Sequence, residues 1–233
     1  MENLPQSKVL LNALTDAERL AFYKKTYAHV AGGVLVFIIF EYLMLQSEAI
    51  VNFALSLTQG YKWLLLLGAF MFMTNYAERM ALNAEDKMLQ YTSYGIYILA
   101  EAFIFVPLLY IAIYYTEGFD LINQAAIVTL GLFTGLSAVV FFTKTDFSFL
   151  RSALTIGFFI AMGLIVAGML FGFDLGLWFS VGMCVLAGGS ILYQTSNLVN
   201  TYSEDQYVPA AIGLFASLML LFWYVLQIFM SRD

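Results

Sequence analysis

The chain has 233 residues, of which 62% are hydrophobic and 11% charged, and its formal net charge is −6. Soluble domains average roughly 45–50% apolar and about 25% charged residues, so a water-soluble fold cannot bury this much apolar surface and a lipid bilayer must cover part of it. The basic residues form no stripe suited to nucleic acid, and the single cysteine, Cys184, excludes an internal disulfide.

Residues 1–26 form a polar segment before the first apolar run. The segment contains both acids and bases, and it lacks the apolar core and small-residue cleavage site of a signal peptide. Thr15 and Glu18 have the spacing of a capping box, which predicts a short helix at about residues 15–25. We therefore expect an N-terminal tail over residues 1–26 and a membrane domain over residues 27–233.

Seven apolar runs follow this tail. A helix needs about 20 predominantly apolar residues to cross a hydrocarbon core of roughly 30 Å, and continuously apolar runs favour helices over the alternating strands of a barrel. The predicted spans are residues 27–45, 61–77, 93–115, 121–143, 149–171, 177–200 and 208–230. We therefore predict an all-α integral membrane protein with seven transmembrane helices.

The distribution of basic residues predicts the orientation. Eight of the ten Lys and Arg residues lie in the tail or in connections expected on the same side of the membrane as the tail. Only Lys62 and Arg232 fall on the other side. Because connections rich in Lys and Arg stay in the cytoplasm, we predict a cytoplasmic N-terminus and a C-terminus outside.

Two acids lie within the predicted spans. Charged side chains in hydrocarbon are costly and indicate a function or a specific partner. Glu41 is near the outer end of the first span, where we expect its side chain to reach the interface. Glu101 lies about 12 Å inside the third span at 1.5 Å per residue, so its carboxyl must be neutral, paired or next to water.

Other polar residues are expected close to the depth of Glu101. The helical rise places Gln194, Ser217 and Ser137 about 12–15 Å from the inner surface, and Asn197 continues this layer towards the cytoplasm. Depth follows from the sequence, but the direction in which each side chain points does not. Two interpretations therefore stay open: a structural hydrogen-bond network between helices, or a site that conducts or senses calcium or protons.

Signatures of enzymes and cofactors are missing from the sequence. There is no Gly-rich phosphate loop, and no set of His, Cys and carboxylate residues has the spacing of metal ligands. The single His gives no support for a catalytic triad. We therefore expect no catalytic residues, no metal site, no cofactor and no enzymatic activity.

Several motifs resemble the Bax inhibitor-1 family, and they occur in family order over most of the chain. Residues 143–150 (TKTDFSFL) resemble the signature after the fourth helix of that family. The other matching segments are residues 22–27 (FYKKTY), Glu101 followed by Pro107, residues 191–197 (ILYQTSN) and residues 207–211 (YVPAA). The resemblance implies a seven-helix fold in which a central hydrophobic helix is surrounded by the others.

The resemblance also implies a function that this sequence alters. Many members of the family resemble pH-sensitive calcium leaks, in which an aspartate in the sixth helix and another in the seventh share protons. The matching positions here are Gln194 and Ser217, which cannot ionise. The carboxylate proton switch is therefore absent, and Glu101 remains as a possible contact for a cation or proton.

The C-terminal segment is similar to the YccA branch of the family, with Ser217 and the closing residues 231–233 as its matching features. The resemblance implies an inner-membrane partner and modulator of the ATP-dependent protease FtsH, engaged through its cytoplasmic N-terminal tail. We take this regulatory role as the first hypothesis. The alternative is a calcium or proton leak centred on Glu101 with a sensor site that lacks aspartates.

Overall fold

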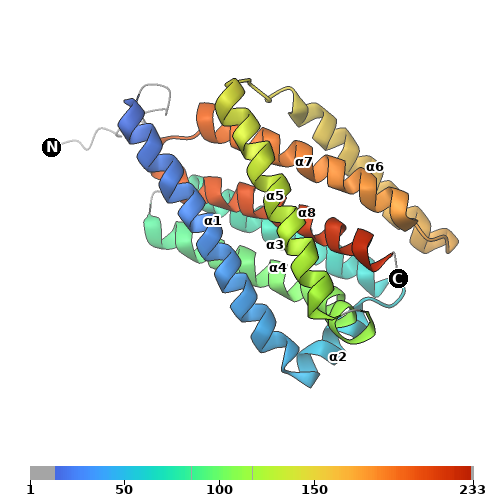
Figure 1. The fold of residues 1–233 in the computed structure, drawn as a ribbon. Helices are drawn as coiled ribbons and strands as arrows, with labels where there is room; N and C mark the ends of the chain where they lie inside the picture. Colours follow the sequence, from blue (N-terminus) through green and yellow to red (C-terminus); the bar gives the residue numbers. More distant parts are fainter. Residues whose placement is uncertain (1–13, 85, 117, 232–233) are drawn as a thin grey trace.

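The computed structural model describes residues 14–84, 86–116 and 118–231, and every regular element within these ranges is a helix (Figure 1). The α-helices are α1 (Asp16–Leu45), α2 (Glu48–Leu57), α3 (Lys62–Asn83), α4 (Lys87–Tyr115), α5 (Phe119–Thr143), α6 (Leu150–Phe171), α7 (Gly176–Asn200) and α8 (Tyr207–Met230), with a short 3-10 helix, η2 (Glu204–Gln206), before α8. The predicted all-α class is confirmed for the described part of the chain.

Six helices in the described ranges are long and apolar enough to cross a membrane: α1, α4, α5, α6, α7 and α8. The predicted second span, residues 61–77, corresponds to α3, which is 22 residues long but is not among these six. The predicted end of this helix at residue 77 is wrong. It continues to Asn83 because residues 78–83 contain no Gly or Pro that would break it. A seventh crossing thus stays a prediction.

Helix α8 is the centre of the bundle and packs against α1, α3, α4, α5 and α7. Its first half carries small residues at Ala210, Ala211, Gly213 and Ala216, which let neighbouring helices approach closely. Ile212, Leu214 and Phe215 are fully buried there. Helix α6, in contrast, lies at the edge of the bundle: it packs mainly on α7, and most of its residues are exposed.

Helix α1 is longer than the predicted first span. It begins at Asp16, where the hydroxyl and backbone N–H of Thr15 bond with Glu18 in the predicted capping box. The expected short helix and the first span are therefore one continuous helix. Residues 1–13, including Lys8, and residues 232–233, including Arg232, lie outside the described residues. The division into a tail and a membrane domain at residue 26 stays a prediction.

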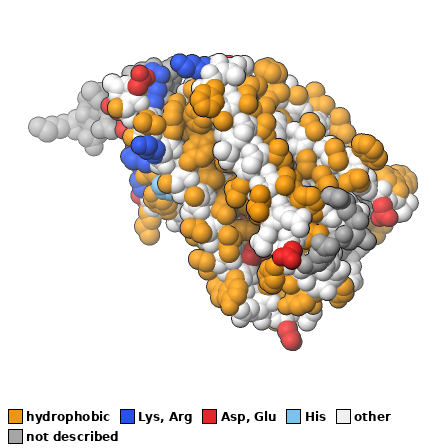
Figure 2. All heavy atoms as spheres, in the orientation of Figure 1, with side chains coloured by type: hydrophobic (Ala, Val, Ile, Leu, Met, Phe, Trp, Pro, Cys, Tyr) orange, Lys and Arg blue, Asp and Glu red, His pale blue; other side chains and the backbone are white. Residues whose placement is uncertain are grey.

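At the end of the bundle where α1 starts, basic residues of α1 and α4 contact the first residue of α8. The Lys25 and Lys87 ammonium groups lie 5.5 and 4.1 Å from the centre of the Tyr207 ring. Figure 2 shows Lys and Arg side chains gathered at this end, and hydrophobic side chains over much of the remaining visible face. The connections predicted on the N-terminal side thus share one end of the molecule.

The loop between α5 and α6 is anchored at the same end. The Phe147 N–H donates to Ser196 Oγ at 2.9 Å, and Ser196 Oγ donates to Asp146 Oδ1 at 3.1 Å. Hydrogen bonds from the Ser148 backbone N–H and hydroxyl hold the pKa of Asp146 below its ordinary value. The motif in residues 143–150 therefore connects this loop to α7.

The expectation that Glu41 reaches the membrane interface is wrong. Its side chain is 5% exposed, and both carboxylate oxygens are buried without a hydrogen-bond partner among the described residues. Glu41 follows Gly33 and Phe37 at intervals of four residues, so it points to the same buried face of α1. Although Glu41 is near the end of α1, it lies on the face of the helix that packs into the bundle, so its side chain is buried.

Candidate functional site

A small cavity of about 200 Å³ brings three of the predicted residues together. Glu101 comes from α4, Gln194 from α7 and Ser217 from α8. The other residues that line the cavity are Phe70, Glu78, Tyr97, Ser190, Ile212, Gly213, Ala216 and Leu220. The structure therefore supplies the direction of these side chains, which the sequence could not predict.

Two hydroxyl groups and one amide form the α7–α8 side of this cavity. Ser190 Oγ and Ser217 Oγ are 2.8 Å apart, and Ser217 Oγ donates to the Gly213 carbonyl at 2.9 Å. The Gln194 side chain lies over Gly213, because a Cβ built on that glycine would be 2.8 Å from Gln194 Oε1. The two positions at which the family resemblance implies aspartates thus face one cavity as uncharged groups.

Two carboxyl groups form the opposite side. Glu101 is 6% exposed and makes no hydrogen bond with the described residues, and Glu78 on α3 is half-buried. The sequence reasoning missed Glu78 because it ended the second span one residue earlier. The uninterrupted helical sequence after residue 77 was the signal that could have placed Glu78 on α3.

Two of the predicted residues lie outside this cavity. Ser137 on α5 is buried, with its Oγ 3.5 Å from Thr195 Oγ1 on α7. Asn197 is half-buried on α7 and is not part of the cavity wall. The single polar layer expected from depth is therefore divided between a cavity and an α5–α7 contact. A function for the cavity or for the α5–α7 contact stays a prediction.

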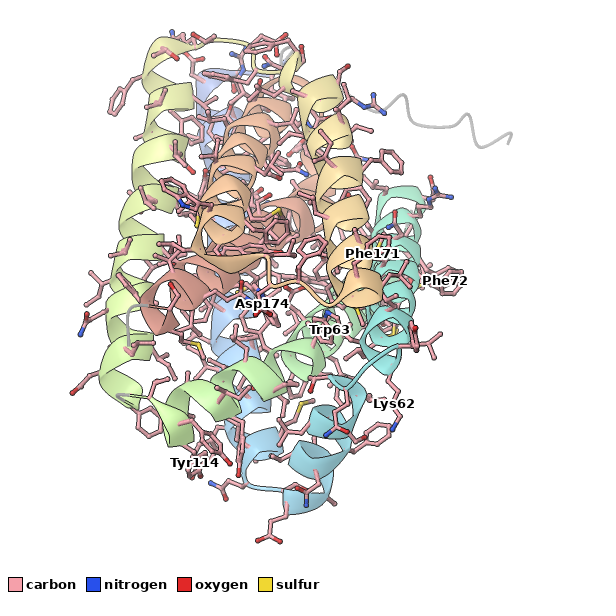
Figure 3. The ribbon with its side chains drawn as sticks, turned by 90° about the vertical axis from the view of Figure 1, so that its right-hand side faces the viewer. Lys62, Trp63, Phe72, Tyr114, Phe171 and Asp174 are labelled. Atoms are coloured by element: carbon pink, nitrogen blue, oxygen red, sulfur yellow. The ribbon has the colours of Figure 1, made fainter. Side chains whose placement is uncertain are left out.

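A larger cavity of about 890 Å³ opens towards the other end of the bundle. Figure 3 shows Trp63 and Asp174 in this region, with Phe72 of α3 and Phe171 of α6 on the flank. Glu101, Phe70 and Leu220 line both cavities. Glu101 therefore lies where the two cavities meet, with its carboxyl group available to either one.

This arrangement suits the binding of a cation or the transfer of a proton. A carboxyl group at the junction of two cavities can exchange a proton, and neighbouring hydroxyl and amide oxygens can accept hydrogen bonds or contact a cation. In the described part of the chain, no three His, Cys, Asp or Glu side chains form a group that could hold a metal ion. The geometry thus places a carboxyl group close to hydroxyl and amide groups on one cavity wall.

Apolar helices around a buried central helix, with polar groups on internal cavities, define a multi-pass helical membrane protein. The chain belongs to the Bax inhibitor-1 family, because the family described as "Inhibitor of apoptosis-promoting Bax1" matches residues 19–233. This match confirms the family resemblance found in the motifs, and similarity to YccA proteins supports the bacterial YccA-like branch.

Curated relatives come from bacteria and eukaryotes. The chain is 36% identical over 124 residues to "Uncharacterized protein PA2604" of Pseudomonas aeruginosa, covering 53% of this chain and 55% of that protein. It is 33% identical over 117 residues to "Modulator of FtsH protease YccA" of Escherichia coli, covering 49% and 53%. It is 29% identical over 113 residues to "Bax inhibitor 1" of Schizosaccharomyces pombe, covering 46% and 41%. The chain thus spans about half the length of these relatives.

Proposed function

We propose that this protein is a multi-pass inner-membrane protein that modulates an FtsH-type ATP-dependent membrane protease in the quality control of membrane proteins. The observation that carries the proposal is the similarity to the relative named "Modulator of FtsH protease YccA". Another relative is named "Inner membrane protein YccA". The excess of Lys and Arg on one side supports a cytoplasmic N-terminus and an external C-terminus.

The N-terminal segment is the proposed contact with the protease. Residues 1–26 are polar, and most side chains of residues 15–25 are exposed. An exposed segment that buries little apolar surface is a suitable handle for another protein, because engaging it does not disturb the bundle.

Deletion of residues 1–20 is expected to abolish co-purification with FtsH. A second deletion, of residues 2–13, tests the same segment while it keeps the Thr15–Glu18 capping box of α1. Both variants should reach the membrane, and the 2–13 variant should unfold at about the temperature of the full chain because α1 keeps its capping box. Undiminished recovery of FtsH with the longer deletion would contradict the proposal.

A calcium or proton leak is the second candidate function, and the position of Glu101 favours it. Glu101 lines both cavities, so an ion that passed from one to the other would meet this carboxyl group. The altered positions Gln194 and Ser217 lie beside that route. Such a leak would lack the aspartate pair that gives many relatives their pH response.

Substitution of Glu101 with Gln is expected to lower calcium or proton flux in proteoliposomes at least about tenfold, which corresponds to about 1.4 kcal/mol in the barrier. The reason is that glutamine keeps the size of the side chain and removes the carboxylate. Glu48→Gln is the matched control, because Glu48 is on α2 and lines neither cavity. Absence of flux for the parent protein at both acid and neutral pH would exclude the leak.

A further inference from the structure

The larger cavity is an aromatic chamber between α3, α4, α6, α7 and α8. Trp63 and Trp223 stack with ring centres 6.4 Å apart and an angle of 22° between their planes. Phe105 meets Trp223 edge-on at 4.8 Å, and Phe179 meets Tyr224 edge-on at 6.0 Å. Its volume of about 890 Å³ falls within the range of about 300–1,000 Å³ that is typical of small-molecule sites.

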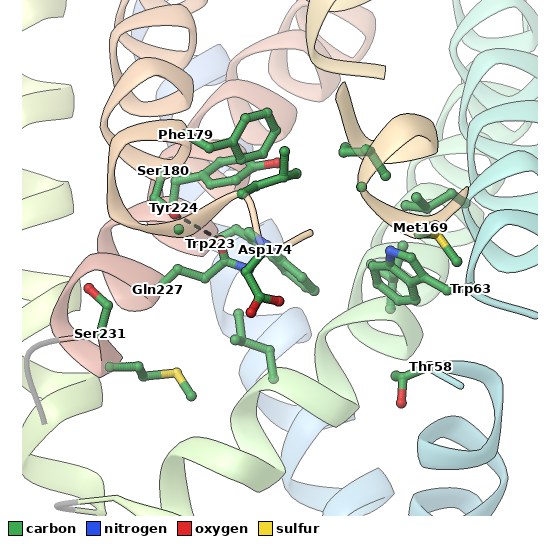
Figure 4. A pocket seen from close by; sticks show the side chains of 18 of the residues that line it. Thr58, Trp63, Met169, Asp174, Phe179, Ser180, Trp223, Tyr224, Gln227 and Ser231 are labelled. Carbon is green, nitrogen blue, oxygen red and sulfur yellow. Dashed lines mark hydrogen bonds between the residues drawn. The ribbon is translucent and has the colours of Figure 1, made fainter. Parts of the chain in front are cut away.

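The described residues that line this chamber include acids but no bases. Asp174 and Glu101 contribute carboxyl groups to the wall, and no Lys or Arg is among the described residues that line it. In Figure 4 the Asp174 side chain extends into the chamber, with Trp223 behind it, Trp63 on one side and Gln227 on the other. Asp174 is exposed, whereas Glu101 is buried and makes no hydrogen bond with the described residues. The Asp174 carboxylate beside aromatic rings can therefore attract a cation.

The chamber also has an apolar side between α3 and α6. Trp63, Leu67 and Phe70 of α3 form one edge, and Ile165 and Met169 of α6 contribute to the opposite edge. Each of these two helices packs on other partners: α3 on α4 and α8, and α6 on α7. Exposed Phe72 and Phe171 continue the apolar surface outside (Figure 3). A molecule with an apolar tail can therefore enter from the bilayer.

We propose that this chamber binds an amphiphilic ammonium compound, with the ammonium group near Asp174 and the tail between α3 and α6. The faces of aromatic rings attract cations, and Trp is the most effective of them. Asp174 supplies the compensating charge, and Ser180 and Gln227, hydrogen-bonded to each other at 3.2 Å, form a polar margin. This inference is independent of the proposed interaction with a protease.

Tryptophan fluorescence provides a direct test, because two of the three Trp residues line the chamber. Trp178, which is 84% exposed, is replaced with Phe so that only Trp63 and Trp223 report. The protein in phosphatidylcholine nanodiscs is titrated with 12-bromododecyltrimethylammonium, whose bromine quenches Trp on contact. The probe 12-bromododecyl sulfate has the same chain and the opposite charge. We expect saturable quenching by the ammonium probe alone.

Variants at two acids separate binding at the chamber from general attraction to the surface. Asp174→Asn should raise the half-saturating concentration about five- to tenfold, as expected for loss of a charge contact beside aromatic rings, and Asp174→Glu should preserve binding. Asp120→Asn is the matched control, since Asp120 is an exposed acid at the start of α5 outside the chamber. Equal quenching by the two probes, or an unchanged curve for Asp174→Asn, would overturn the proposal.

Discussion

Replacement of Gly33 with alanine should destabilise the protein by about 1–3 kcal/mol, the usual cost of overpacking a core. A Cβ at this position would lie 2.0 Å from Tyr94 Oη, 2.8 Å from Tyr94 Cζ and 3.3 Å from Phe215 Cδ2. Tyr94 is buried, and its hydroxyl donates to the His29 carbonyl at 3.0 Å. The ring therefore has to give up this hydrogen bond or push α1 away from α4.

The neighbouring Gly32 is the control for this experiment. A Cβ there would have no neighbour within 4 Å, so Gly32→Ala should raise stability by up to about 1 kcal/mol through helix propensity. Thermal unfolding in detergent should show a midpoint about 2–12 °C lower for Gly33→Ala than for the parent. Adding Tyr94→Phe should recover part of the loss, because it removes the closest atom. Equal midpoints for the two alanine variants would contradict the packing described here.

The sequence predicts most of the helices because apolar runs of the required length carry a strong signal. Helix ends are predicted less well, since polar residues that continue a helix resemble the start of a loop. α3 continues beyond residue 77 and α4 begins at Lys87 rather than at residue 93. In both places the polar residues next to the apolar run include no Gly or Pro, so the helix extends beyond the run.

The depth of the candidate site could also be predicted, because a helix rises by a constant amount per residue. That rule placed Glu101, Gln194 and Ser217 at similar depths, and they line one cavity. It placed Ser137 at the same depth, but Ser137 contacts Thr195 elsewhere. The direction of a side chain depends on the packing of whole helices, and hydropathy in a single sequence does not specify it.

The larger cavity had no signal in the sequence. Asp174 lies in the connection between α6 and α7, where an acid is ordinary. Trp63 lies at the start of one apolar run and Trp223 lies inside another, and aromatic residues are ordinary in membrane helices and at their ends. Their stacking joins residues 160 positions apart in the chain, which is a property of the tertiary fold.

Restoring acids at both altered positions, with Gln194→Asp and Ser217→Asp together, should make stability strongly dependent on pH. The cavity of about 200 Å³ already has Glu78 and Glu101 on its wall, so the variant confines four carboxyl groups there. At low pH the added groups are neutral and can hydrogen-bond with each other or with Ser190. As pH rises they ionise readily in the unfolded chain, whereas ionisation in the cavity costs several kcal/mol because like charges are buried together. Stability must therefore fall as pH rises.

The paired substitutions Gln194→Asn and Ser217→Asn match the size of the two aspartates without their charge. We expect the unfolding midpoints of the Asp and Asn variants to be similar at pH 4. At pH 8 the midpoint of the Asp variant should be lower by about 10 °C, because a loss of several kcal/mol lowers the midpoint by about 2–4 °C per kcal/mol. Such a difference would mean that the two positions share a cavity in which an ionised pair is strained, which is the condition for a proton switch. Parallel midpoints across the pH range would place the two groups in water, and the uncharged Gln194 and Ser217 would then have no bearing on how this protein responds to pH.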